Sequence, residues 1–316
     1  MLHTVTLGSY GPAVGAVGLG CMGMSWAYDP SGRDEDTSAG VLRQALDLGV
    51  NLIDTADVYG PFTNEELVGR ALAGRRAQAV LATKVGFVAG EQRLRRDGRP
   101  EHIRAAVDAS LRRLGTDHID LYQLHRVDPE VPLTETWGAM AETVRAGKVR
   151  MLGLSDVTAE QVRTAHEVHP VAAVQTELSL WTRDALAQLV PFTERSGIAC
   201  IAYAPLGRGF LTGRFRSAQD VPEGDWRRGN PRFEDAAFAA NLPMVDRIRG
   251  VAERHGASAA QIALAWVMTR GRYVVPIPGT KNPAFLKENV RASEVRLAPE
   301  DLQVLDGLPE PVGARQ

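Results

Sequence analysis

Short apolar runs alternate with longer amphipathic segments along almost the whole chain of 316 residues. The apolar runs are bounded by Gly, Pro or polar residues, as buried strands are, and most amphipathic segments stop at a glycine, a frequent signal just past a helix. The predicted strands are residues 14–19, 50–54, 80–84, 119–124, 149–154, 172–175, 198–203 and 273–277. The predicted helices are residues 37–48, 64–73, 101–114, 134–146, 158–169, 183–196, 241–255, 283–292 and 299–305.

This alternation indicates a parallel sheet, because each helix returns the chain to the start of the next strand. Eight strands favour an α/β fold of the closed type, a (β/α)8 TIM barrel, over an open sheet. No linker rich in Pro, Ser and Gly divides the chain, so residues 1–316 are expected to form a single domain. Residues 207–240 show little periodicity, and a loop of that length in a compact domain usually has a function or is disordered.

The segment Gly18-Leu-Gly20-Cys-Met-Gly23 matches the G-x-G-x-x-G pattern of dinucleotide-binding folds. That fingerprint needs a helix directly after the glycines, so that the helix N-terminus faces the pyrophosphate. Pro30 and Gly32 interrupt any such helix, and the next predicted helix begins near Thr37. We therefore interpret the segment as a tight turn after the first strand, where small residues let a ligand approach the backbone.

Composition excludes several classes of protein. Lys and Arg number 36 against 38 Asp and Glu, giving a net charge of −2 without a basic stripe, so no nucleic-acid partner is expected. No apolar run reaches about 18 residues, so no membrane partner is expected. The N-terminus lacks the regions of a signal peptide, and two cysteines make no disulfide framework, which together favour the cytoplasm. His166 and His169 lack the spacing of a zinc-binding helix, so no metal is expected.

Polar or small residues stand at the ends of seven predicted strands. In chain order they are Asp54, Lys84, His125, Ser155 with Asp156, Gln175, Tyr203, and Gly279 with Thr280. Any one of them alone is more often a solvated or hydrogen-bonded structural residue than a functional one. In a barrel, however, the carboxyl ends of all strands share one rim, and that rim holds the active site. The repetition therefore predicts a site there.

The chemistry of this set is that of a general acid with polarising neighbours. Tyr59 lies just beyond Asp54, and Lys84 lies one strand further on. A free tyrosine titrates near 10, and a lysine cation beside it is expected to lower that pKa by stabilising the phenolate. Asp54 can supply the counter-charge of a partly buried lysine. His125 can donate a hydrogen bond to a carbonyl oxygen whose charge becomes negative.

The residues resemble the aldo-keto reductase family. Asp54, Tyr59, Lys84 and His125 match its catalytic tetrad in order and in strand placement. The similarity covers roughly residues 5–305, and residues 174–183 look most like the branch of pyridoxal-reductase-like and perakine-reductase-like enzymes. The segments that resemble the family are residues 51–60, 119–125, 147–155, 203–213 and 276–280.

The resemblance implies an oxidoreductase of the alcohol dehydrogenase and carbonyl reductase class. It would use NADP(H) to reduce an aldehyde or ketone to an alcohol, with the cofactor extended across the rim and residues 207–240 folded over it. Tyr59 would donate the proton, Lys84 would tune Tyr59, Asp54 would hold Lys84, and His125 would orient the carbonyl.

The resemblance also implies a set of cofactor contacts, from the nicotinamide to the adenine. Ser155, Asp156 and Gln175 would bind the carboxamide, and Tyr203 would stack on the nicotinamide ring. The implied residues are Gly20, Cys21, Met22, Ser155, Asp156, Gln175, Tyr203, Leu206, Gly207, Arg208, Gly209, Leu211, Gly279, Thr280, Lys281, Glu288 and Asn289.

Two positions depart from the family pattern. Many relatives have Asn where this chain has Asp156, and Asp can accept a hydrogen bond from the carboxamide but cannot donate one. Relatives often carry more basic residues after Lys281, whereas Asn282, Pro283 and Ala284 follow here. Lys281 is therefore the cation expected to meet the 2′-phosphate, with Arg208 or loop arginines as candidates to assist it.

Two other functions fit the same barrel. Lys84 at a strand end could attack a carbonyl as a Schiff-base lyase does, although the Asp54 and Tyr59 context argues against this. A non-catalytic regulatory subunit, like the channel-associated β-subunits of the family, would need a partner surface that the sequence does not display. An apolar pocket or core packing equally explains the aromatic residues Trp26, Tyr28, Phe87 and Trp181.

Overall fold

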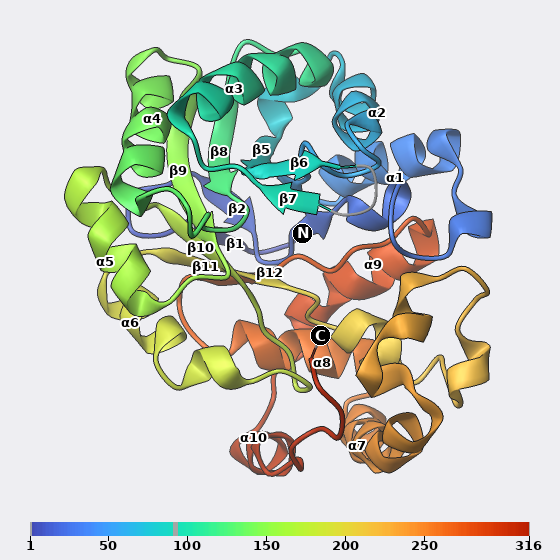
Figure 1. Cartoon of the computed structure of the whole chain (residues 1–316). Helices are drawn as coiled ribbons and strands as arrows, with labels where there is room; N and C mark the ends of the chain where they lie inside the picture. The colour runs from blue at the N-terminus through green and yellow to red at the C-terminus, as the bar shows by residue number, and fades with distance from the viewer. Residues whose placement is uncertain (1, 91–93, 316) are drawn as a thin grey trace.

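The computed structural model describes residues 2–90 and 94–315. Eight parallel strands follow one another around a barrel in the order of the chain, as Figure 1 shows. They are β3 (Leu19–Gly20), β4 (Leu52–Asp54), β5 (Val80–Val85), β8 (Ile119–Leu124), β9 (Val149–Ser155), β10 (Ala173–Glu177), β11 (Ala199–Tyr203) and β12 (Val274–Pro276). The predicted single-domain (β/α)8 barrel is confirmed.

Two glycines allow the first and last strands to meet. A parallel bridge pairs Gly20 with Gly279, and the Gly18 amide donates to the Pro276 carbonyl over 2.9 Å. A Cβ on Gly279 would lie 3.0 Å from the Gly20 carbonyl oxygen, and a Cβ on Gly20 would lie 3.0 Å from the Ile277 carbonyl oxygen. The strand edges approach this closely because neither residue carries a side chain.

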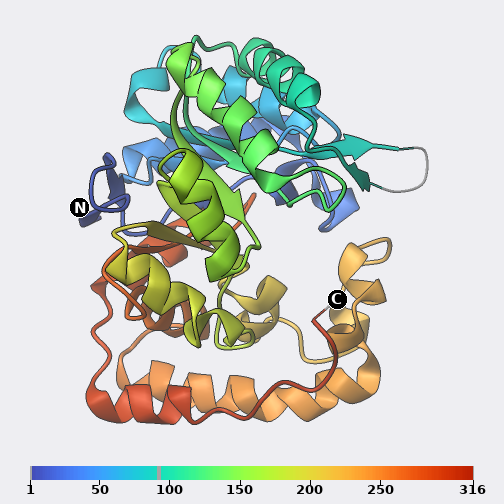
Figure 2. The ribbon, with the colours of Figure 1, turned by 60° about the vertical axis from the view of Figure 1, so that its left-hand side comes forward.

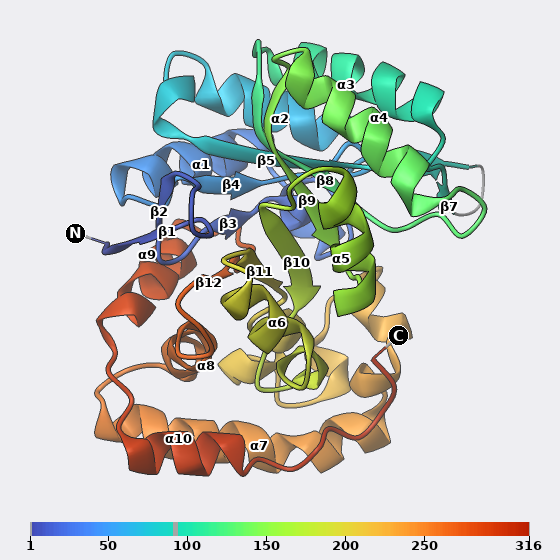
Figure 3. The ribbon, with the colours of Figure 1, turned by 90° about the vertical axis from the view of Figure 1, so that its left-hand side faces the viewer.

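Helices follow the barrel strands and cover the outside of the sheet. They are α1 (Glu35–Asp47), α2 (Thr63–Leu72), α3 (Pro100–Leu114), α4 (Leu133–Arg145), α5 (Ala159–Val168), α6 (Leu189–Arg195), α8 (Ala259–Met268) and α9 (Pro283–Arg291). Two further helices, α7 (Asp235–Arg254) and α10 (Pro299–Asp306), pack against each other along one side of the molecule (Figure 3). Within the described residues, no helix has both the length and the apolar character needed to cross a bilayer.

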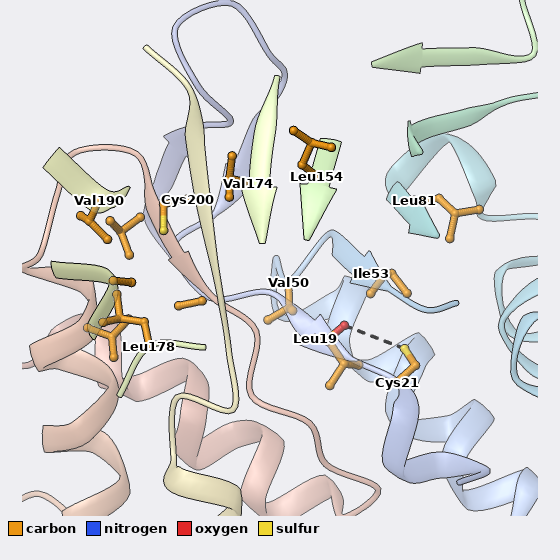
Figure 4. Close-up of a cluster of buried hydrophobic side chains, with 14 of the residues drawn as sticks. Leu19, Cys21, Val50, Ile53, Leu81, Leu154, Val174, Leu178, Val190 and Cys200 are labelled. Carbon is orange, nitrogen blue, oxygen red and sulfur yellow. Dashed lines mark hydrogen bonds between the residues drawn. The ribbon is translucent and has the colours of Figure 1, made fainter. Parts of the chain in front are cut away.

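Side chains along each strand alternate between the barrel interior and the surrounding helices. Leu52 and Ala82 belong to the interior cluster of buried residues. Their neighbours in sequence face outward, where Ile53 and Leu81 pack in the larger cluster beneath the helices. Figure 4 shows this outer layer, with Val190 of α6 among the strand residues. The interior is thus filled by side chains at mid-height and leaves only the strand ends for chemistry.

An antiparallel hairpin closes the amino end of the barrel. It consists of β1 (Thr4–Thr6) and β2 (Ala13–Gly15). Leu7 and Val14 are fully buried and join the interior cluster. In Figures 2 and 3 the N-terminus lies on the opposite side of the molecule from the C-terminus. The hairpin therefore covers the amino ends of the barrel strands and leaves their carboxyl ends at the opposite end of the barrel.

Several elements differ from the sequence predictions. The apolar run 14–19 is not one strand, because β2 belongs to the hairpin and only β3 joins the barrel. Predicted helix 183–196 is a 3-10 turn at Asp184–Leu186 followed by α6. A second hairpin of β6 (Phe87–Ala89) and β7 (Leu94–Arg96), after β5, was not predicted.

The loop predicted over residues 207–240 ends earlier, because residues 235–240 form the first turns of α7. The alanines there are strong helix formers, and α7 continues through Pro243 even though proline has no amide hydrogen to donate. Helix α8 was missed entirely. It is buried on nearly all sides, so it shows no amphipathic period, but Ser258 and Gln261 form a capping box that marks its start.

Candidate active site

The predicted tetrad gathers at the carboxyl ends of the barrel strands. Asp54 on β4 and Lys84 on β5 each follow an inward-facing residue by two positions, so the strand period points both into the barrel. Tyr59 lies in the connection from β4 to α2, and His125 directly follows β8. Asp54 and His125, at opposite ends of this stretch of sequence, therefore lie at the same end of the barrel.

The ammonium of Lys84 is the hub of this group. It is buried and donates to Asp54 Oδ2 over 2.6 Å, to the Thr55 carbonyl over 2.9 Å and to the Tyr59 hydroxyl over 3.2 Å. Burial lowers the pKa of Lys84, but the charge of Asp54 and the phenol of Tyr59 outweigh burial, and the pKa lies above its ordinary value. Lys84 is therefore a cation whose three N–H donors are all satisfied.

The phenol of Tyr59 is more weakly acidic than the sequence indicated. Burial raises its pKa, the ammonium of Lys84 lowers it, and the net value lies above the ordinary 10.0. The prediction of a lowered pKa is wrong, because it counted the cation beside the phenol but not the loss of water around it. Tyr59 consequently keeps its proton at neutral pH, and Lys84 acts by stabilising the phenolate as it forms.

His125 is held neutral next to this phenol. Burial, followed by the charges of Lys84 and Arg126, lowers its pKa well below the ordinary 6.5. The His125 ring lies edge-on to Tyr59 at 5.7 Å between centroids and to Phe87 at 4.9 Å. Its buried Nδ1 makes no hydrogen bond within the part of the chain that the structure describes. A neutral imidazole can donate a hydrogen bond without adding charge to the site.

Two amides complete the surroundings of Asp54. Gln123 Nε2 donates to Asp54 Oδ1 over 3.1 Å, and Gln175 Nε2 donates to the same oxygen over 2.8 Å. Both oxygens of the carboxylate are thus occupied, one by amides and the other by Lys84. Gln123 was not predicted. Its place two residues before His125, on the inward face of β8, was the available signal.

A second polar group lies beside the tetrad, at the ends of β9 to β11. The Tyr203 hydroxyl donates to Asp156 Oδ2 over 2.8 Å, and Arg126 forms an ion pair with the same oxygen. Asp156 has a positive φ of 49°, a conformation that Asp tolerates better than most residues. Ser155 is buried and accepts from Arg126 over 3.2 Å. Residues 155, 156 and 203 therefore form one cluster, whereas Gln175, which the sequence analysis grouped with Ser155 and Asp156, donates to Asp54.

Of the remaining predicted cofactor residues, Cys21 and Leu211 are fully buried in the larger core cluster. Lys281 Nζ donates to the Asp29 carbonyl over 2.8 Å and lies 3.3 Å from the Asp29 carboxylate. Arg208 is likewise paired with a carboxylate, that of Glu177 over 3.1 Å. Asn289 is buried in α9, next to half-buried Glu288.

The segment 207–233 is joined by hydrogen bonds to the loop that follows β3. It contains short 3-10 turns, and Asp225 Oδ2 accepts from the Asp29 amide over 2.7 Å. Arg227 pairs with Asp225 and donates to the Arg208 carbonyl over 2.9 Å. These contacts link two distant parts of the chain, the loop near position 29 and the segment that contains Arg208 and Asp225.

The four aromatic residues singled out in the sequence differ in their surroundings, which are either the tetrad or the protein core. The Trp26 ring lies 5.8 Å from that of Tyr59, and Phe87 contacts His125, so these two flank the tetrad. Trp181 is 2% exposed and stacks on Phe210 at 4.2 Å, which makes it a core residue. Tyr28 packs edge-on against Trp226 of the segment 207–233.

A protein-family model described as the aldo/keto reductase family matches residues 16–310. The chain belongs to the aldo-keto reductase family. A probable aldo-keto reductase 1 from Glycine max is 40% identical over 311 residues, covering 98% of this chain and 89% of that protein. Oxidoreductases of this family use nicotinamide cofactors and act on small-molecule carbonyl substrates.

Solved structures of aldo-keto reductases superpose over nearly the whole chain. A glycerol dehydrogenase from Gluconobacter oxydans is 32% identical, with a TM-score of 0.86 over 96% of this chain and 94% of that one. An aldo-keto reductase from Bacillus halodurans, in its holo form, is 28% identical, with a TM-score of 0.81 over 100% and 99%. The resemblance to the pyridoxal-reductase-like and perakine-reductase-like branch stays a prediction.

Proposed function

We propose that this aldo-keto reductase is an NADP(H)-dependent carbonyl reductase in which Tyr59 is the general acid. The observation that carries the proposal is the buried contact of the Lys84 ammonium with both Asp54 and the Tyr59 hydroxyl at the barrel mouth. A phenol beside a fixed cation can release its proton to an oxygen that becomes negative. The substrate would be an aldehyde or a ketone.

The residues present fit a nicotinamide cofactor. Asp156 makes its three described polar contacts through Oδ2 alone, so Oδ1 can accept from a carboxamide. The close pair Gly20 and Gly279 leaves backbone without side chains at the rim. When bound, NADPH supplies the hydride that reduces the carbonyl carbon.

The roles of the tetrad follow from its contacts. Neutral His125 would donate a hydrogen bond to the carbonyl oxygen and fix its position. Tyr59 would transfer its proton to that oxygen as negative charge develops there. Lys84 would stabilise the phenolate left behind, and Asp54, held by two amides, would keep the ammonium in place.

The contacts of Lys84 disfavour a Schiff-base lyase. An amine attacks a carbonyl only when it is unprotonated, whereas Lys84 has a raised pKa and three hydrogen-bond acceptors. The proposed reductase therefore fits the same residue better. Borohydride treatment in the presence of substrate is expected to leave no adduct on Lys84.

Lys281 is proposed to favour NADPH by meeting the 2′-phosphate. Lys281→Ala is expected to raise KM for NADPH by about tenfold or more, since a hydrogen bond to a charged group contributes about 1.5–3 kcal/mol. KM for NADH should change little. The measurement is cofactor oxidation with a panel of simple aldehydes.

The matched control is Lys287→Ala, which removes an exposed lysine of the same charge from α9. It is expected to leave both KM values unchanged. Equal catalytic efficiency of the unaltered enzyme with NADH and NADPH would refute the NADP preference.

The pKa values predict a flat pH profile for reduction. Tyr59 has a pKa above 10 and stays protonated until the pH rises through that raised value. His125 has a pKa far below 6.5 and stays neutral above it. We expect kcat/KM for an uncharged aldehyde to be constant between about pH 7 and 9, since this parameter reports the free enzyme's acid and base. A decline with a midpoint inside that window would contradict the assignment.

A further inference from the structure

The C-terminal segment 309–315 ends inside the barrel mouth. After α10 it runs along α7, where the Val312 amide donates to Asn241 Oδ1 over 2.9 Å and the Val312 carbonyl accepts from Asn241 Nδ2 over 3.0 Å. Asn230 Nδ2 then donates to the Arg315 carbonyl over 3.0 Å. Figure 2 shows this trace rising from the helices to the turns of segment 207–233. These contacts bring one side chain, that of Arg315, to the site.

The guanidinium of Arg315 bridges three groups that come from separate strands. Its Nη2 donates to the Tyr203 hydroxyl over 2.8 Å and to Asp156 Oδ2 over 3.3 Å. Its Nε donates to Glu177 Oε2 over 2.9 Å. The fixed fork of a guanidinium can satisfy such a set of acceptors at once, which an ammonium cannot do with the same geometry.

These contacts fix the orientation of the Asp156 and Tyr203 side chains. The Tyr203 hydroxyl accepts from Arg315 while it donates to Asp156, so its ring is held at the tip. Arg315 and Arg126 both engage Asp156 Oδ2, so the carboxylate turns its other oxygen away from them. The two side chains proposed to contact the nicotinamide are thus oriented by a residue from the far end of the sequence.

Glu177 extends this arrangement to the segment above the site. The oxygen that accepts from Arg315 also accepts from Arg208 over 3.1 Å, and the other oxygen accepts from Thr182 over 3.0 Å. Glu177 is 3% exposed, so both of its arginine partners compensate a buried charge. One carboxylate therefore links the position of Arg315 to that of Arg208 in the segment 207–233.

We propose that Arg315 is a positioning residue for cofactor binding, which orients Asp156 and Tyr203 for the nicotinamide and, through Glu177, holds Arg208 of the covering segment. This inference rests on the proposed function, because it takes Asp156 and Tyr203 as nicotinamide contacts. The carboxylate of Asp156 suits the arginine, since a carboxylate pairs with a guanidinium more strongly than an amide would.

The test compares Arg315→Ala with Arg315→Lys in the full-length enzyme. Arg315→Ala is expected to raise the Kd for NADPH by about tenfold and to lower kcat, because hydrogen bonds between charged groups are lost and the two nicotinamide contacts are freed. Arg315→Lys restores the charge but not the fork, so it should recover only part of the loss. Fluorescence titration gives Kd, and thermal unfolding shows whether the fold is intact.

The control is Glu310→Gln in the same segment. Glu310 is largely exposed and pairs only with Arg183 among the described residues. Removal of this surface pair should leave Kd, kcat and the melting temperature unchanged.

A double-mutant cycle separates positioning from general destabilisation. If Arg315 acts through Asp156, the increase in Kd for Arg315→Ala combined with Asp156→Asn should be less than the product of the single increases. Independent effects, or tighter NADPH binding by Arg315→Ala, would overturn the positioning role. Failure of the unaltered enzyme to bind NADPH would instead overturn the proposed function, so the two failures are distinct.

Discussion

Tyr59→Phe is expected to lower kcat/KM for carbonyl reduction by about 10²–10⁴-fold, the contribution of a positioned general acid. The substitution removes only the hydroxyl that accepts from Lys84 and keeps the ring that packs beside Trp26 and His125. The Kd for NADPH should therefore remain unchanged. Steady-state oxidation of NADPH and fluorescence titration measure the two quantities.

Tyr122→Phe is the matched control. Tyr122 lies on the same barrel, on β8, and its buried hydroxyl has no hydrogen-bond partner in residues 2–90 and 94–315. Loss of that hydroxyl should leave turnover unchanged. If Tyr59→Phe retained the turnover of the unaltered enzyme, the proton would have to come from another group.

Lys84→Met is expected to lower kcat/KM about as much as Tyr59→Phe does. It should also lower the free energy of unfolding. The carboxylate of Asp54, 3% exposed, would keep its amide donors but lose its cation. Breaking a buried ion pair by removing one partner costs about 3–5 kcal/mol. Urea unfolding should show this decrease in the free energy of unfolding.

The double variant Asp54→Asn with Lys84→Met tests the origin of that decrease. An Asn oxygen at the position of Asp54 Oδ1 can still accept from Gln123 and Gln175, and no unpaired charge remains. Most of the stability should return, whereas the activity should not. A double variant no more stable than Lys84→Met would show that the unpaired carboxylate is not the cause.

A strand was predictable where a short apolar run is bounded by glycines or polar residues, and a helix was predictable where apolar residues recur on one face. Strands such as β5 and β8 are short and apolar with glycines or polar residues at their ends, and the helices around them are amphipathic. Helix α8 was not predicted because burial on almost all sides removes its amphipathic period. The prediction of one strand over residues 14–19 was wrong because two strands in different sheets, β2 and β3, share one apolar stretch.

The tetrad was predictable because strand ends converge in a barrel, whichever positions they occupy in sequence. The acidity of Tyr59 was not, since burial decides it and a motif does not report burial. Gln123 had a signal in its strand position. Arg315 had none, because its place depends on how the segment after α10 is fastened to Asn241 and Asn230.

The hairpin of β1 and β2 has a kinetic consequence. Leu7 and Val14 are fully buried in the interior cluster that the barrel strands share. Disruption of the hairpin would expose the apolar side chains at the amino ends of those strands to water. The speed at which the hairpin forms can therefore limit the rate at which the whole barrel completes its core.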